Sequence, residues 1–391
     1  MYILLLVKYP PIQGGVSANC YWLAQALVEL GHRVTVLTNA GEVEDECRIN
    51  LSEEDLGFLN GFRIPNSIKV VSTKKDSEHY FIPQSNPYLS KLISLGLDII
   101  SADRPDFIWA YYIEPYGIAA LTLSKLTGIP YVIQHAGSDL GRLGLTEQMK
   151  SIHQEVYRQA LIVSTGQKHY PYFESIGVNK DNFARCGFRH LPGDLFYPIY
   201  SNSQTHGTKI LVYGKTGSQK GTPQLIEAIK LLWNEEFDVH LTAYWGGRNL
   251  KNTTRQLLEA NIRKECIDVH GFIPHWRIPE AIRESDAVVF LENNFNISFH
   301  TPGIPLEVLS CGRFLITTEE IAKKFPNLIS IKNTIVIDGQ SLESKAIARA
   351  IKLVPKMCPE LNEKDFLNAS IVYSQGMNNL ERFLSIIQAR L

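Results

Sequence analysis

The sequence contains no long hydrophobic run. No stretch of 18 apolar residues occurs among its 391 residues, so nothing in it is typical of a membrane-spanning helix. The apolar start at residues 2–7 is interrupted by Lys8 and two prolines, which makes it too short for the core of a signal peptide. We therefore expect a cytoplasmic protein. Peripheral contact with the inner face of the membrane stays open.

Cysteine is scarce and scattered, and the familiar metal and nucleophile motifs are missing. The six cysteines form no CxxC pair, which argues against a disulfide framework and a zinc ribbon. The sequence also has no HExxH, no Gly-x-Ser-x-Gly and no EF-hand loop. Zinc protease, α/β-hydrolase and calcium-binding functions are therefore unsupported, and we predict no metal site.

Charge of either sign is not in excess. Lys and Arg number 39 and Asp and Glu 40, which gives a formal net charge of -1. A general nucleic-acid binder normally has a basic excess, so we expect no nucleic-acid partner. Hydrophobic residues make up 45% and charged residues 20%, as in ordinary globular proteins, and the length suggests two or three domains.

Hydrophobic periodicity predicts two similar α/β domains. In residues 1–190, short apolar runs alternate with amphipathic stretches. The runs predict strands at 3–7, 34–37, 107–111, 131–134 and 161–164, and the stretches predict helices at 16–30, 87–102, 117–126, 146–160 and 169–176. Strands that alternate with helices indicate a parallel sheet covered on both faces.

A linker at 191–208, rich in turn-forming and small polar residues, separates this domain from a second one at 209–365. There we expect strands at 210–213, 239–244, 267–269, 287–291, 314–317 and 334–337, with helices at 223–233, 252–261, 277–284 and 305–310. The fold class is thus α/β with two doubly wound, Rossmann-like domains. Ligands of such sheets bind beyond the carboxyl ends of the strands, so we expect a cleft between the domains.

Two glycine-containing loops follow predicted strands. Gly14 and Gly15 precede the first helix, where they allow a ligand to approach the backbone and a helix N-terminus can face an anion, although a plain tight turn explains them equally well. The second loop starts at Gly214 and contains Lys215 and Lys220, which can neutralise a diphosphate or can simply be solvated surface lysines. It is not a Walker A loop, because its glycine spacing differs.

Two further segments contain polar residues near strand ends. Gly303 and Ile304 open the helix predicted at 305–310, and Glu307 in its first turn can accept hydroxyl hydrogen bonds from a sugar or can merely favour the helix dipole. His135 and Asp139 follow the strand at 131–134. They can bind hydroxyl groups or transfer protons, or they can form only local hydrogen bonds.

Taken in order, these motifs resemble the retaining glycosyltransferases of family 4, which have the GT-B fold. The resemblance rests on Pro-Pro-x-x-Gly-Gly, the strand-end His135, the Gly-[Arg/Lys]-x4-Lys-Gly loop, Gly-Phe-Ile-Pro, and Pro-Leu-Glu-x-x-x-Cys-Gly. It covers nearly the whole chain, and the ordered set is more specific than any single motif. It implies a sugar transferase with a nucleotide-sugar donor, a carbohydrate, lipid-linked or small-molecule acceptor and no cofactor. It also implies that a final helix near 377–391, within 366–391, crosses back to the first domain.

The resemblance assigns roles to matching residues. Lys220 matches the lysine that holds the donor diphosphate, and Lys215 stands where the family usually has arginine. Glu307 matches the second glutamate of the Glu-x7-Glu motif, which binds the ribose. The other matches are His135 for the transferred sugar, Gly14 and Gly15 for the loop that faces the donor phosphates, and Phe272 and Ile273 for the segment that borders the base. We add Gly214, Gly303 and Ile304 to the candidate donor-binding residues and Asp139 to the candidate sugar contacts.

The sequence departs from the family at the first glutamate of that motif, where it has Phe299. The family role of this position is contact with the donor sugar, and we hypothesise that the adjacent His300 replaces it. Two alternatives stay open. Phe299 and Lys215 keep open a non-catalytic binding subunit with the same fold. A nucleotide-sugar 2-epimerase would also share the fold, but it would need further carboxylates in the cleft, which the sequence spacing does not place.

Overall fold

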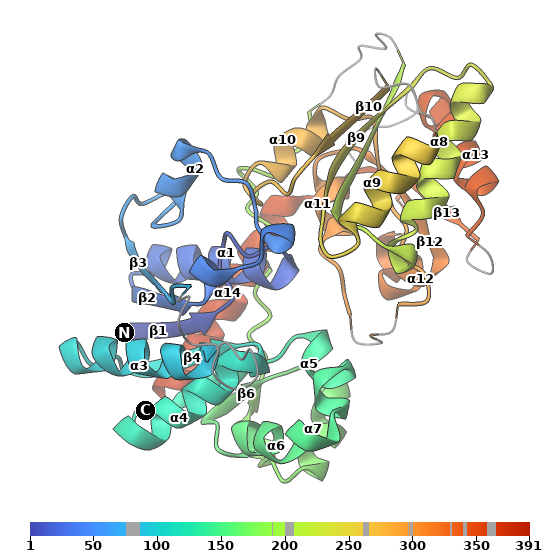
Figure 1. Ribbon diagram of the computed structural model, residues 1–391. Helices are drawn as coiled ribbons and strands as arrows, with labels where there is room; N and C mark the ends of the chain where they lie inside the picture. Colours follow the sequence, from blue (N-terminus) through green and yellow to red (C-terminus); the bar gives the residue numbers. More distant parts are fainter. Residues whose placement is uncertain are drawn as a thin grey trace.

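The computed structural model consists of two α/β domains, each built on one parallel sheet (Figure 1). It describes residues 1–75, 87–189, 191–199, 207–260, 266–295, 297, 300–328, 331–338, 342–357 and 365–391. The predicted fold class is confirmed.

The sheet of the first domain has seven strands in the order β3-β2-β1-β4-β5-β6-β7. Every pair in it is parallel. The central strand β1 is buried along its whole length because helices cover both faces of the sheet, which explains its uninterrupted apolar sequence. The strands are β1(Tyr2–Val7), β2(Arg33–Thr38), β3(Ile68–Ser72), β4(Phe107–Tyr111), β5(Tyr131–Gln134), β6(Ile162–Ser164) and β7(Phe183–Ala184).

The helices of this domain largely match the predicted ones. The first ends before Gly31, whose φ of 79° is the left-handed conformation that the sequence predicts at this place. The structure adds α2, β3, α5 and β7, which are too short to show a clear periodicity. The helices are α1(Gly15–Glu29), α2(Glu53–Phe58), α3(Tyr88–Ala102), α4(Ile118–Thr127), α5(Gly137–Gly141), α6(Lys150–Arg158) and α7(Tyr170–Ser175).

The second domain has a six-stranded parallel sheet in the order β10-β9-β8-β11-β12-β13. Its strands are β8(Thr208–Lys215), β9(Val239–Gly246), β10(Ile267–His270), β11(Ala287–Phe290), β12(Phe314–Thr318) and β13(Thr334–Ile337). The structure adds α12 and α13 to the predicted helices. The full set is α8(Thr222–Asn234), α9(Leu250–Glu259), α10(Ile278–Arg283), α11(Ile304–Ser310), α12(Glu319–Lys324) and α13(Ser344–Met357).

The last helix, α14(Ala369–Gln388), lies against the first domain rather than the second (Figure 1). Asn368 caps its start by accepting a hydrogen bond from the Ile371 N–H at 3.2 Å. Leu380 and Phe383 are fully buried in the same hydrophobic core as β1. The ring of Phe383 packs against that of Trp109 with 5.2 Å between their centroids. The chain therefore crosses between the domains twice.

We predict that Phe383→Ala destabilises the first domain. Removing a buried phenylalanine typically costs about 3–5 kcal/mol because the cavity is only partly refilled. Thermal unfolding of the full chain should show a lower Tm for this variant, whereas the exposed neighbour change Arg382→Ala should leave Tm nearly unchanged. Equal effects of the two changes would contradict the packing of α14 on this domain.

Candidate functional site

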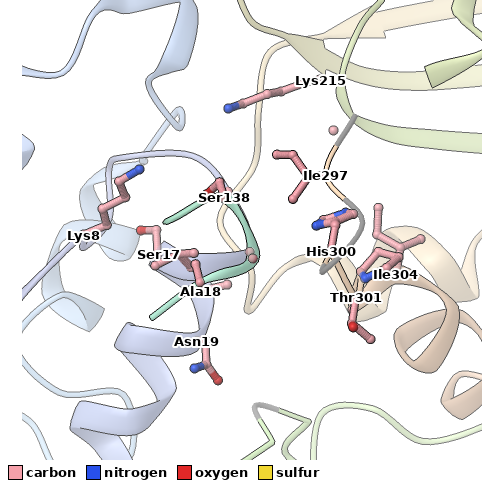
Figure 2. A pocket seen from close by; sticks show the side chains of 18 of the residues that line it. Lys8, Ser17, Ala18, Asn19, Ser138, Lys215, Ile297, His300, Thr301 and Ile304 are labelled. Atoms are coloured by element: carbon pink, nitrogen blue, oxygen red, sulfur yellow. The ribbon is translucent and has the colours of Figure 1, made fainter. Parts of the chain in front are cut away.

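A cleft of about 1320 Å³ lies between the two domains. Residues that line it follow the carboxyl ends of strands in both sheets: Lys8 after β1, His135 after β5, Lys215 at the end of β8 and Glu292 after β11. Figure 2 shows the side chains of Lys8 and Lys215 extending towards each other from opposite sides. Parallel α/β sheets bind their ligands at this edge, so the cleft is the candidate site.

The Gly14–Gly15 loop forms part of the first domain's wall. Gly14 has a φ of 129°, a conformation that side-chain-bearing residues rarely adopt. A Cβ atom at Gly14 or Gly15 would meet no other atom within 4 Å, so the loop borders open space. No side chain caps the start of α1, and its first N–H groups are available to an anion.

The loop after β8 forms the facing wall. Three of its glycines, Gly214, Gly217 and Gly221, have φ angles of 114°, 152° and 67°, which turn the chain sharply before α8. Lys215 and Lys220 both line the cleft. The structure thus brings both predicted lysines opposite the Gly14–Gly15 loop.

Lys220 forms an ion pair with Glu292, a residue that the sequence analysis did not select. The Glu292 side chain is 1% exposed, and its Oε1 also binds His300 Nε2 at 3.2 Å. Burial alone would raise the pKa of Glu292, but the His300 hydrogen bond and the Lys220 charge prevail and lower it. His300 therefore forms a local hydrogen bond at the cleft.

Glu307 is held by a hydrogen-bonded chain that begins in the other domain. Its Oε2 accepts a hydrogen bond from the Tyr213 hydroxyl at 2.7 Å, and its Oε1 lies 3.0 Å from His275 Nε2. The Trp22 indole N–H of α1 donates to His275 Nδ1 at 2.7 Å. Because an indole only donates, Nδ1 must be unprotonated and Nε2 carries the proton that Glu307 accepts.

Further contacts join the domains beside this chain. The Asn50 N–H donates to the Phe272 carbonyl at 2.8 Å, and the Trp276 indole donates to Asp55 Oδ1 at 2.8 Å. Asp55 also pairs with Arg277 at 3.0 Å. These contacts give the short helix α2 a structural role. Asp55 forms the capping box of α2 and also binds Trp276 and Arg277 of the second domain.

Positive charge dominates the cleft. Among the residues that the structure describes there, the acidic side chains are Glu292 and Glu307, which are both already engaged. The Lys8 ammonium lies 3.8 Å from the centre of the Tyr112 ring, and burial together with the charge of Lys215 lowers its pKa to about 8. The cations that line the cleft are Lys8, Arg142, Lys168, Arg185, Arg189, Lys215 and Lys220.

His135 lines the cleft, but both of its ring nitrogens have partners in its own domain. Its Nε2 lies 2.8 Å from the Thr165 hydroxyl, and its Nδ1 lies 3.4 Å from the Ala136 carbonyl oxygen. The ring is 5.1 Å from that of His169. Burial, followed by the neighbouring His169, lowers the pKa of His135 to about 4. The imidazole is therefore neutral at neutral pH.

Asp139 requires a correction. The sequence analysis places it among the sugar contacts, but it is 1% exposed and is not among the residues that line the cleft. Its Oδ2 accepts a hydrogen bond from the Ala136 N–H at 2.7 Å, at the start of α5. Burial raises its pKa to about 7. Asp139 shapes the turn after β5, which is the local alternative.

The remaining predicted residues lie on the second domain's wall. Phe272, Ile273, Gly303 and Ile304 all line the cleft. Phe272 packs over Gly246, where a Cβ atom would lie within 2.3 Å of its ring. Phe299 lies outside the described residues.

Several residues in or next to the cleft were not identified from the sequence. Lys8 and Glu292 each follow a predicted strand directly, and that position is a usable signal. Trp22 and His275 carry no such signal, because their contact is between residues 253 positions apart. Arg185 and Arg189 could not be identified as residues that follow a strand, because β7 has only two residues and gives no periodic pattern in the sequence.

In the described part of the chain, no group of three or more His, Cys, Asp and Glu side chains is arranged to hold a metal ion. No described helix is both long and apolar enough to cross a bilayer.

Two family models match this chain. Residues 14–166 match the glycosyl transferase 4-like domain, and residues 200–364 match the glycosyl transferases group 1 domain. A relative is an uncharacterized glycosyltransferase of Methanocaldococcus jannaschii, which is 25% identical over 153 residues. That match covers 38% of this chain and 35% of the relative, so it spans about a third of the relative's length.

Solved structures share the fold over the whole chain. Anabaena HepE, solved with UDP-glucose, has a TM-score of 0.65 and 15% identity, with 100% of both chains covered. A glycosyltransferase of Rickettsia africae has a TM-score of 0.59 and 14% identity over 97% of this chain and 93% of its own. A UDP-N-acetylglucosamine 2-epimerase of Rickettsia bellii reaches 0.60 at 10% identity, over 100% and 96%. The fold alone therefore does not separate transferases from epimerases.

We predict that the His135 imidazole titrates near pH 4 instead of near its ordinary value of 6.5. Removing it from water disfavours the charged form, and His169 adds to this effect. NMR of the imidazole protons against pH measures the titration, and His135→Gln identifies the signal by its loss. A midpoint near 6.5 would show that the ring is more solvated than the structure has it.

Proposed function

Because this chain belongs to the GT-B glycosyltransferases, we propose that it moves a sugar from a nucleotide-sugar donor to a hydroxyl group of an acceptor. The observation that carries the proposal is one cleft in which Lys215, Lys220 and Glu307 face the Gly14–Gly15 loop. A nucleoside diphosphate needs cations and backbone N–H groups for its phosphates and a carboxylate for its ribose hydroxyls.

We take the donor to be a uridine diphosphate sugar. The support is the relative from Anabaena, which was solved with UDP-glucose in the same fold. In this arrangement Phe272 and Ile273 border the base and Glu307 binds the ribose. Lys215 and Lys220 hold the diphosphate, with Gly303 and Ile304 beside it.

The chemistry asks the protein to stabilise a departing diphosphate. As the sugar–phosphate bond loosens, negative charge accumulates on the leaving group, and preorganised cations lower the energy of that state. Lys220 is preorganised because Glu292 holds it in place and its Nζ lies 4.3 Å from the centre of the Phe295 ring. We propose that these cations suffice without a metal or a cofactor.

We propose further that the reaction retains the configuration of the sugar, as in family 4. The acceptor hydroxyl then attacks from the face that the diphosphate leaves, and a phosphate oxygen takes the proton. The acceptor enters from the first domain, whose wall contains His135. The neutral imidazole of His135 suits a hydrogen-bonding role there rather than that of an acid. A cytoplasmic location stays a prediction.

We expect Lys220→Ala to lower kcat by 100-fold or more. Losing one group that stabilises developing charge typically costs about 2.7–4 kcal/mol in the transition state. The measurement is the release of UDP from UDP-sugars in the presence of a panel of acceptors. Lys230→Ala, on helix α8 that follows the Lys220 loop but outside the residues that line the cleft, is the control and should retain the activity. Undiminished turnover of Lys220→Ala would remove this lysine from the mechanism, and no UDP release by the unaltered protein would favour a binding subunit.

We also expect Trp22→Phe to weaken UDP binding, by about tenfold if the lost orientation of Glu307 costs about 1.4 kcal/mol. The variant removes the N–H that fixes the His275 tautomer. Trp276→Phe is the matched control, because it removes an indole hydrogen bond at the same interface without touching this chain. Calorimetric titration with UDP compares the two, and equal affinities would contradict the positioning role of Trp22.

A further inference from the structure

Six of the seven described cations of the cleft fall into two groups, and the proposed donor uses only one of these groups. Lys215 interacts electrostatically with Lys8, Lys220 and Arg142, which gathers these four around the expected diphosphate. Arg189 instead interacts with Arg185 and Tyr111. We name Arg185 and Arg189 the arginine pair. Both residues line the cleft.

The topology of the first sheet separates Arg185 from the donor loop. Arg185 directly follows β7, and Gly14 follows β1. Three strands, β4, β5 and β6, lie between these two in the sheet. At about 4.8 Å per strand, β7 is roughly 19 Å from β1. One diphosphate beside Gly14 and Lys220 therefore leaves Arg185 for another group.

The local backbone fixes the arginine pair in the cleft wall. The Thr165 N–H donates to the Ala184 carbonyl at 2.8 Å and so extends the β6–β7 pairing up to Arg185. Gly187 then turns the chain with a φ of 66°, and the backbone of Arg189 lies against Gly376 of α14, where a Cβ atom would approach within 2.9 Å. The backbone of the arginine pair is thus held by the sheet at Arg185 and by helix α14 at Arg189.

The two neighbouring positive charges of the arginine pair favour binding of an anion. In the part of the chain that the structure describes, no carboxylate forms an ion pair with Arg185 or Arg189. Burial and the repulsion from Arg185 lower the pKa of Arg189. A bound anion would relieve this repulsion, and guanidinium groups bind phosphate and carboxylate in a bidentate manner.

Resting on the proposed function, we propose that the acceptor is anionic and that the arginine pair binds its phosphate or carboxylate group. The location fits an acceptor, because the arginine pair belongs to the first domain's wall, as His135 does, whereas Lys215 and Lys220 belong to the second domain. Binding there would fix the acceptor at one end and leave a hydroxyl free to reach the donor sugar. A neutral acceptor would make no use of either charge.

The test measures binding of small anionic sugars to the full chain saturated with UDP. Glucose 6-phosphate, glucuronate and glucose are titrated by calorimetry. We expect glucose 6-phosphate or glucuronate to bind at least tenfold more tightly than glucose, and the preferred one shows whether the anion is a phosphate or a carboxylate. The variant Arg185→Gln/Arg189→Gln should weaken that binding at least tenfold and change UDP affinity less than twofold.

Arg382→Gln, on the exposed face of α14, controls for the loss of positive charge in general and should bind the anions normally. Glucose binding as tightly as both anions would overturn the proposal, as would unchanged anion affinity in the double variant. If the double substitution changed only the preference for UDP-glucuronate over UDP-glucose, the anion would lie on the donor, and this result would also overturn the proposal. The titrations are repeated without UDP. Failure of UDP to bind would contradict the proposed function. The anion titrations without UDP test the anion binding of the arginine pair independently of that result.

Discussion

The hydrogen-bonded chain from Trp22 through His275 to Glu307 ties the site to the position of the two domains. Trp22 belongs to α1 of the first domain, whereas His275 and Glu307 belong to the second. The indole fixes the tautomer of His275, and the tautomer determines that Glu307 receives a proton donor. In the proposed function Glu307 binds the ribose, so its carboxylate must be correctly oriented before the ribose hydroxyls arrive. The geometry of the proposed nucleotide site thus depends on a contact that exists only when the domains meet.

The cleft owes its chemical character to an imbalance of charge. Among the described residues, seven cationic side chains line it, and the two carboxylates there, Glu292 and Glu307, are bound to other residues. Glu292 holds Lys220, so this lysine is positioned before any phosphate binds. The crowding of positive charge disfavours the protonated form of Lys8, since burial and the nearby Lys215 lower its pKa to about 8. Such repulsion is relieved when anions enter, which suits a site for phosphorylated substrates.

The sequence predicted what depends on local pattern and missed what depends on long-range contact. The apolar strand β1 and the left-handed Gly31 follow from neighbouring residues, as do the two glycine loops. Glu307 was found because a motif marks it, but its partners Trp22 and His275 come from distant segments. Asp139 was misplaced because a polar residue after a strand can turn inwards to cap the chain, as its bond with Ala136 shows. The arginine pair follows a two-residue strand, which has no detectable periodicity.

A crystal structure of the protein with UDP tests the central claim most directly. The account predicts ribose hydroxyls within about 2.6–3.2 Å of the Glu307 carboxylate, diphosphate oxygens at Lys215 and Lys220, and His275 still between Trp22 and Glu307. A ribose bound away from Glu307, or UDP held by the first domain's wall alone, would contradict it.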